Sequence, residues 1–166
     1  MYYFIVNPHS GSGRGLRVWQ TIERIIARKH IQYEAYLTEG PQDAALYAAE
    51  ITQVKAAPQN AEEPSNADSD CECRKMLGED DVIVVVGGDG TFGEVLNGMN
   101  TDAPAALGYV PVGMGNDLAR SLNLSRSTSW QIRRILRAKK TRCLDYGIVT
   151  VDGENGESCH RRFIVS

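Results

Sequence analysis

Residues 82–98 read VIVVVGGDGTFGEVLNG, so an uninterrupted aliphatic run gives way to glycine and then to a helix-forming segment. A strand that is apolar at every position is typical of a parallel sheet covered on both faces. The glycines that follow permit a close approach to the backbone, and a helix that begins there presents unpaired N–H groups. We therefore expect residues 87–91 to bind an anion such as a phosphate group.

Strands and helices alternate along most of the chain. The apolar periodicity predicts strands at 2–6, 31–38, 82–86 and 107–110, and helices at 16–30, 41–54, 91–99, 116–122 and 127–139. This order predicts an α/β fold: a Rossmann-like parallel sheet with helices on both faces and right-handed crossovers. Two further strands, at 141–151 and 161–166, predict the start of a second, β-rich lobe, with a hairpin that closes a single domain as the alternative.

The composition is that of a globular protein of one domain or one lobe. Of the 166 residues, 42% are hydrophobic and 23% are charged. No run of about 18 uncharged apolar residues occurs, so we expect no membrane-spanning segment. The first residues read as a strand rather than a signal peptide, and the four cysteines lack the spacing of a disulfide framework, which together predict a cytoplasmic protein.

Charge is distributed unevenly along the chain. Residues 55–81 carry eight acidic and three basic side chains, and we expect them to form a mobile surface insertion. Residues 120–142 carry eight basic side chains and no acidic one, which predicts attraction to an anionic membrane surface, with an ordinary solvated helix as the alternative. Nucleic acid is not an expected partner, because Trp130 is the only aromatic residue of that stretch. The oligomeric state stays open, a homodimer included.

Three glycine-rich corners follow predicted strands. The first corner is NPHSGSGRG (7–15), the second is GGDGT (87–91) and the third is PVGMGND (111–117). Because open α/β sheets bind ligands at the carboxyl ends of their parallel strands, we expect the three corners to converge there. No Lys-Ser or Lys-Thr closes these loops as in a P-loop, and no acidic residue is clearly placed to bind a ribose as in a dinucleotide fingerprint.

Asp89 lies inside the second corner, where a carboxylate repels phosphate unless a cation lies between them. Mg²⁺ is the cation that suits oxygen ligands and phosphate groups. Asp89 is therefore a candidate metal ligand, with a local cap of the helix start as the alternative. Thr91 would either cap the same helix or contact phosphate.

The segments NPHSG, Thr38, GGDGTFGEVLNG and VPVGMGNDLAR resemble, in order and spacing, the catalytic domain of the diacylglycerol kinase family, which includes bacterial lipid kinases, sphingosine kinases and ceramide kinases. The resemblance covers nearly the whole chain apart from residues 55–81. It implies a two-lobed enzyme that transfers the γ-phosphoryl group of ATP to a lipid hydroxyl with Mg²⁺. Residues 1–142 would be its α/β nucleotide-binding lobe, and residues 143–166 a β-hairpin that leads into an absent β-sandwich lobe.

The resemblance also implies roles for particular residues, with Asp89 directed toward the metal. The candidate nucleotide-binding residues are Asn7, Pro8, His9, Ser10, Gly11, Thr38, Gly87, Gly88, Asp89, Gly90, Thr91, Glu94, Gly113, Met114, Asn116 and Asp117. The general base of the family comes from its second lobe, so no catalytic residue is assigned. We expect this chain alone to bind nucleotide weakly and not to turn over.

Two residues depart from the pattern of the family. Met114 replaces the threonine of the third corner and Gly93 replaces an asparagine after the second, and both changes remove hydrogen-bonding groups. Two other functions stay open. An NAD kinase shares GGDGT but not the NPHSG and GMGNDLAR segments, and a non-catalytic regulatory module would keep the fold without the activity.

Overall fold

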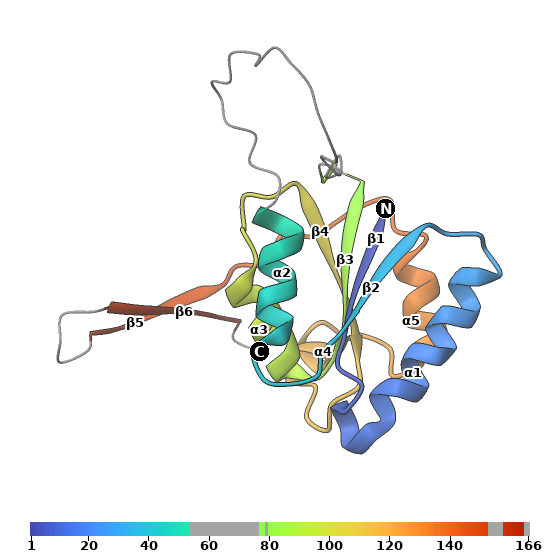
Figure 1. Ribbon diagram of the computed structural model, residues 1–166, viewed down its shortest axis with the longest axis horizontal. Coiled ribbons are helices and arrows are strands. Elements are labelled where there is room, and N and C mark those ends of the chain that lie inside the picture. Colours follow the sequence, from blue (N-terminus) through green and yellow to red (C-terminus); the bar gives the residue numbers. More distant parts are fainter. Residues whose placement is uncertain (54–76, 79, 153–157, 165–166) are drawn as a thin grey trace, which may run out of the picture.

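The computed structural model describes residues 1–53, 77–78, 80–152 and 158–164. The central sheet has four parallel strands in the order β2-β1-β3-β4 (Figure 1), and these are β1 (Tyr2–Val6), β2 (Tyr33–Leu37), β3 (Asp81–Gly87) and β4 (Ala105–Pro111). The helices of the described residues are α1 (Ser10–Ala27), α2 (Asp43–Gln53), α3 (Asp89–Gly98), α4 (Asp117–Ser121) and α5 (Thr128–Ile135). The predicted α/β fold with a parallel sheet is confirmed.

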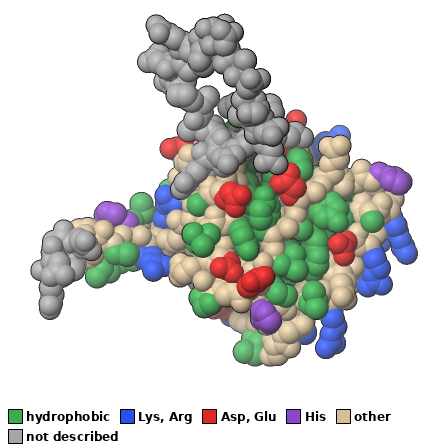
Figure 2. Space-filling view, in the orientation of Figure 1, with side chains coloured by type: hydrophobic (Ala, Val, Ile, Leu, Met, Phe, Trp, Pro, Cys, Tyr) green, Lys and Arg blue, Asp and Glu red, His purple; other side chains and the backbone are tan. Residues whose placement is uncertain are grey.

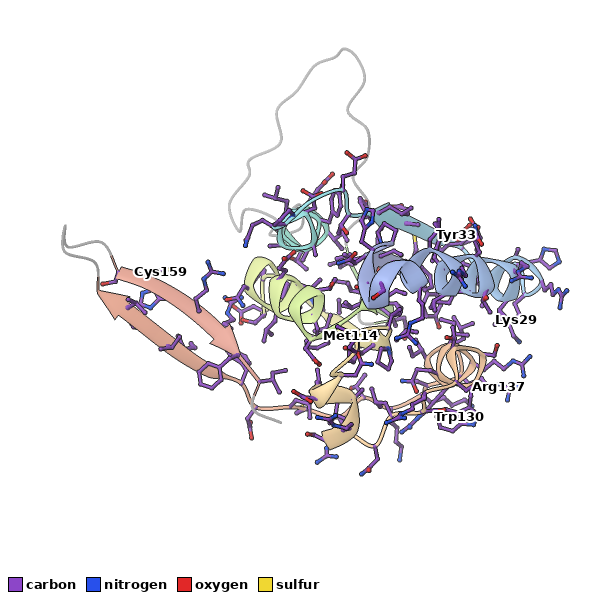
Figure 3. All side chains as sticks on the ribbon, turned by 90° about the horizontal axis from the view of Figure 1, so that it is seen from below. Lys29, Tyr33, Met114, Trp130, Arg137 and Cys159 are labelled. Atoms are coloured by element: carbon purple, nitrogen blue, oxygen red, sulfur yellow. The ribbon has the colours of Figure 1, made fainter. Side chains whose placement is uncertain are left out.

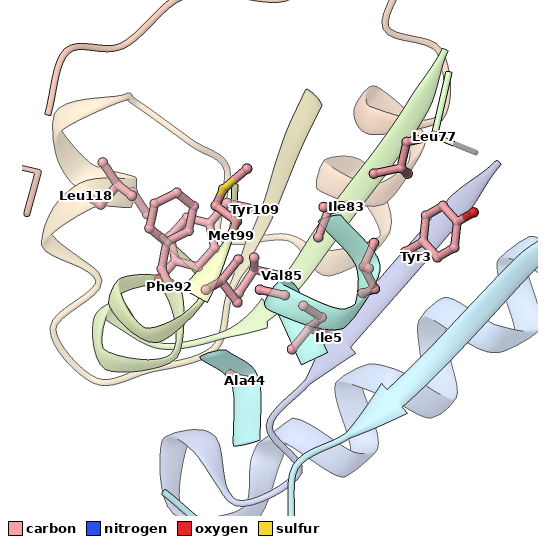
Figure 4. Packing of buried hydrophobic residues seen from close by; sticks show 14 residues of the cluster. Tyr3, Ile5, Ala44, Leu77, Ile83, Val85, Phe92, Met99, Tyr109 and Leu118 are labelled. Carbon is pink, nitrogen blue, oxygen red and sulfur yellow. The ribbon is translucent and has the colours of Figure 1, made fainter. Parts of the chain in front are cut away.

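Helices cover both faces of this sheet: α1 and α5 lie on one face, and α2 and α3 on the other (Figure 1). In β3, Ile83 and Val85 pack against α2 and α3, and Figure 4 shows this cluster. Val84 and Val86 point the other way and pack against α1 and α5. All four side chains are fully buried, which explains why the strand carries no polar residue between its ends.

The helices differ slightly from their predicted bounds. α3 begins at Asp89, earlier than predicted, with Gly88 as its N-cap. α1 begins at Ser10, but residues 11–13 have left-handed backbone angles, so its regular part starts close to the predicted position. α5 ends at Ile135, earlier than predicted, with Leu136 as its C-cap.

The predicted acidic insertion lies outside the described residues except at its end. Leu77 is buried in the cluster between the sheet and α2. Asp81 opens β3, and its carboxylate accepts hydrogen bonds from the amino group of Met1 and from the N–H of Gly78. The folded domain therefore resumes at Leu77 rather than at residue 82, because these side chains are either apolar or paired.

The predicted C-terminal hairpin is confirmed. β5 (Gly147–Asp152) and β6 (Ser158–Phe163) pair in antiparallel fashion and project away from the central sheet (Figure 1). Arg162 attaches the hairpin to α3, because its Nη1 donates to the carbonyl oxygens of Leu96 (3.0 Å) and Met99 (2.8 Å). Its backbone also exchanges two hydrogen bonds with the side chain of Asn97. The division into two lobes at residue 142 stays a prediction.

Candidate functional site

The first and second corners meet through Asn7, directly after β1. Its Oδ1 accepts hydrogen bonds from the backbone N–H groups of His9 (3.0 Å) and Ser10 (3.1 Å), which closes the first corner. Its Nδ2 donates to Oγ1 of Thr91 (3.1 Å), which ties that corner to α3. Thr91 is buried and makes no cap, so the expectation that it caps the helix start is wrong. Its hydroxyl is used to join two corners.

The second and third corners touch through backbone atoms. A Cβ added to Gly113 would lie 2.8 Å from the Cα of Gly88, which is closer than real Cβ contacts come. The first corner reaches the third in the same way, since a Cβ on Gly11 would lie 2.2 Å from the carbonyl oxygen of Val112, and the φ of Gly11 is +60°. Glycine is required at these points because larger residues would push the corners apart. The predicted convergence of the three corners is therefore observed.

Asp89 connects the second corner to α4. Its Oδ2 accepts from the backbone N–H of Asp117 (3.0 Å) and its Oδ1 from that of Leu118 (3.3 Å). Asp89 thus caps a helix far along the chain rather than the start of its own. The carboxylates of Asp89 and Asp117 also line one pocket, whose other walls are apolar residues of α3, α4 and the end of the hairpin. Asp117 is paired there with Arg120.

Two buried polar atoms near these corners have no hydrogen-bond partner among the described residues: the amide oxygen Oδ1 of Asn116 and the hydroxyl of Tyr109. Asn116 has a left-handed backbone and donates from Nδ2 to the carbonyl oxygen of Gly113 (2.6 Å), which shapes the third corner. Burial raises the pKa of Tyr109, and the nearby carboxylate of Asp89 raises it further. The phenol therefore remains a protonated donor up to a higher pH than an ordinary tyrosine.

The donor set suits a magnesium ion that arrives with phosphate groups. No cluster of three His, Cys, Asp or Glu residues that could hold a metal occurs in the described part of the chain. Mg²⁺, however, is usually held by one or two carboxylates together with phosphate oxygens and water. Asp89 and Asp117, which line one pocket, supply such a pair.

Other predicted site residues lie apart from these contacts. Thr38 is buried at the end of β2, where its N–H donates to the carbonyl oxygen of Val6 (2.9 Å), and β1 separates it from the second corner. Met114 is 87% exposed at the tip of the third corner, and Figure 3 shows its position. Glu94 is half-buried on α3, outside the lining of the pocket. Contacts of these three residues with a nucleotide stay predictions, as does the role of Pro8.

Arg14 is a site residue that the reading of the sequence did not single out. Its Nη2 donates to the carbonyl oxygen of Val112 (3.3 Å) and its Nε to that of Gly11 (3.1 Å). The guanidinium thus bridges the first and third corners and brings a positive charge to a candidate anion site. The signal was its place inside the glycine-rich GSGRG segment of the first corner.

Comparison with known proteins gives a consistent result. The family described as "Diacylglycerol kinase catalytic domain" matches residues 1–149. A diacylglycerol kinase of Staphylococcus saprophyticus is 29% identical over 140 residues, which cover 83% of this chain and 38% of that protein. A diacylglycerol kinase of Bacillus subtilis is 49% identical over 51 residues, or 30% of this chain and 17% of that protein.

A solved structure has the same fold. The crystal structure of a diacylglycerol kinase from Bacillus anthracis superposes with a TM-score of 0.65 at 23% sequence identity, covering 95% of this chain and 44% of that one. The chain thus spans less than half of the length of these relatives.

Proposed function

Since the chain belongs to the diacylglycerol kinase catalytic domain family, we propose that it is the nucleotide-binding lobe of an ATP-dependent lipid kinase. The observation that carries this proposal is the meeting of the three glycine corners at the carboxyl edge of the sheet, where Gly88 and Gly113 approach one another through the backbone. Backbone N–H groups there and at the start of α3 suit phosphate oxygens. Neither an NAD kinase nor a non-catalytic module is favoured by the family match.

In this proposal the phosphates of ATP lie against the second and third corners, and Asp89 and Asp117 hold the Mg²⁺ that accompanies them. The ion would offset the negative charge of the phosphates. The lipid hydroxyl oxygen forms a bond to the γ-phosphorus while the bond from that phosphorus to the departing ADP oxygen breaks. The hydroxyl proton passes to a base that we assign to the part of the relatives' length that this chain does not span. The chain by itself is then expected to bind nucleotide without turnover.

We also propose that the protein acts as a peripheral protein at the cytoplasmic face of a membrane, because a lipid substrate resides there. Among the described residues, every helix is too short or too polar to cross a bilayer.

Gly90 offers a direct test of the phosphate site. It lies in the first turn of α3, and a Cβ added to it meets no atom within 4 Å, so Gly90→Ala places a methyl group in open space at the corner. Alanine also favours the helix over glycine. We expect Gly90→Ala to weaken Mg-ATP binding about ten-fold or more, equivalent to ~1.4 kcal/mol, without lowering the thermal stability of the protein.

Gly40→Ala is the matched control, because a Cβ there also meets no atom within 4 Å and Gly40 follows β2, away from the second corner. Affinity is measured by titration of the full chain with Mg-ATP, and folding by thermal unfolding. Equal affinities of the two variants, or no saturable Mg-ATP binding by the unaltered protein, would contradict the proposed site. Phosphorylation of any lipid by residues 1–166 would contradict the assignment of the base.

A further inference from the structure

The outward surfaces of α1 and α5 form a continuous basic face. The two helices are in contact on one side of the sheet (Figure 1). Their inward positions are Trp19, Ile22 and Ile26 on α1 and Ile132 on α5, all of them buried. With 3.6 residues per turn, the opposite sides of the two helices carry exposed arginines. Two more exposed arginines lie where the helices end, Arg28 directly after α1 and Arg137 two residues after α5. We call these residues the basic face: Arg17, Arg24, Arg28, Arg133, Arg134 and Arg137.

The charge of this region is strongly one-sided. Residues 10–29 carry five Lys or Arg side chains and residues 126–142 carry seven, against the single carboxylate of Glu23. Among the described residues, none of these twelve cations is in an ion pair with a carboxylate. In Figure 2, Lys and Arg side chains gather along the edge formed by α1, whereas Asp and Glu lie over the middle of the view. The basic face therefore suits an anionic partner.

The structure changes the extent of the basic stretch predicted from sequence. Arg120 is paired with Asp117 at the candidate site, so it does not belong to the basic face. The arginines of α1 do belong to it, although they lie about a hundred residues earlier in the chain. Packing of α1 against α5 brings the two groups together. Because α1 starts within the first corner, this surface borders the candidate nucleotide site.

Trp130 distinguishes between kinds of anionic partner. Its side chain is 51% exposed on the outward side of α5, and the guanidinium of Arg134 lies 5.4 Å from the centroid of its ring. Figure 3 shows Trp130 and Arg137 together on this side of the molecule. A tryptophan beside arginines is typical of surfaces that enter lipid headgroups, where the indole is half apolar and half wet. Single-stranded nucleic acids stack on several aromatic side chains of the proteins that bind them, and this surface exposes one.

We propose that the basic face binds the anionic headgroups of a membrane, with Trp130 entering the headgroup region. The choice of a lipid partner rests in part on the proposed lipid kinase function. Binding to vesicles, however, is measured without ATP or Mg²⁺. Loss of vesicle binding would therefore leave the nucleotide site unaffected, and failure of ATP binding would leave the membrane surface unaffected.

The test uses the full chain and vesicles of phosphatidylcholine, with or without an equal part of phosphatidylglycerol. We expect sedimentation with the anionic vesicles only, reversal by high salt, and a blue shift of tryptophan emission that Trp130→Phe abolishes. Arg133→Gln and Arg137→Gln should each weaken binding about five-fold, the fold-change that corresponds to ~1 kcal/mol per basic residue near an anionic surface. Thermal unfolding checks that each variant folds.

Arg161→Gln is the matched control, because Arg161 is exposed on β6 and its loss removes the same charge away from the basic face. It should leave vesicle binding within about two-fold of the unaltered protein. The proposal is overturned if Arg161→Gln weakens binding as much as Arg133→Gln. It is also overturned if tryptophan emission does not change, or if a double-stranded RNA binds more tightly than the anionic vesicles at the same ionic strength.

Discussion

Asp89 is expected to have two separable roles, one in stability and one in metal-dependent binding. Its carboxylate accepts hydrogen bonds from the N–H groups of Asp117 (3.0 Å) and Leu118 (3.3 Å) at the start of α4. Loss of a helix cap costs ~1 kcal/mol, within a range of about 0.5–2 kcal/mol. Since the freed N–H of Asp117 is exposed and can bind water, we expect the cost of Asp89→Ala in free energy of unfolding to lie near the lower end of that range. The melting temperature should then decrease by about 2–4 °C or less.

Asp89→Asn separates the two roles. The amide retains one oxygen as an acceptor for α4, so the free energy of unfolding should fall by about half as much as in Asp89→Ala. The negative charge is lost completely. If Asp89 holds Mg²⁺, the affinity for Mg-ATP should fall about ten-fold, which is ~1.4 kcal/mol. Without Mg²⁺ the sign reverses: removal of the carboxylate relieves its repulsion of phosphate, and ATP should bind more tightly than to the unaltered protein.

Urea unfolding gives the free energies, and titrations with ATP in the presence of Mg²⁺ or of a chelator give the affinities. Asp102→Asn is the control. Asp102 is exposed on the loop after α3, and this substitution removes the same charge as Asp89→Asn. A decrease in ATP affinity that is equal with and without Mg²⁺ would refute the metal role and leave Asp89 as a cap alone. No stability difference between Asp89→Ala and the unaltered protein would refute the capping role.

Two further predictions concern stability. Arg162→Ala removes a guanidinium that donates to two carbonyl oxygens at the end of α3. We expect the free energy of unfolding, measured in urea, to fall by about 1–3 kcal/mol. The control Arg161→Ala, at an exposed position, should change it by less than about 0.5 kcal/mol. Burial, and then its hydrogen bond to Glu34, raises the pKa of Tyr36 to about 12, above the ordinary value of 10.0. The unfolded chain therefore loses this proton first, so stability is lost as the pH rises between those values, and Tyr36→Phe should flatten that loss in unfolding curves measured at alkaline pH.

Local sequence patterns predicted most of the fold. The apolar run in β3 and the alternation of helix and strand predicted a parallel sheet, because burial on two faces leaves no position for a polar residue. The predicted limits of the folded segments were less accurate where no local pattern of apolar residues marked them. Leu77 follows a long polar stretch, so nothing in its neighbourhood indicated that it would be buried in the core.

The candidate site was predictable to the extent that its parts are backbone corners. Glycine-rich corners such as those around Gly88 and Gly113 permit a close approach of two backbone segments, and parallel strands bring their carboxyl ends to one edge. Side-chain partners were not predictable in the same way. Thr91 accepts a hydrogen bond from Asn7 instead of capping its own helix, which depends on how two corners meet in space.

The amino-acid sequence by itself determined which segments are strands, where the chain turns on glycine, and which family it resembles, because these depend on the chemistry of neighbouring residues. Only the tertiary structure decided that Asp89 caps α4, that Arg162 holds the end of α3, and that arginines of α1 and α5 form one surface. Those contacts join residues far apart in the chain. Their geometry is set by the packing of helices on the sheet, and periodicity within a single segment carries no information about it.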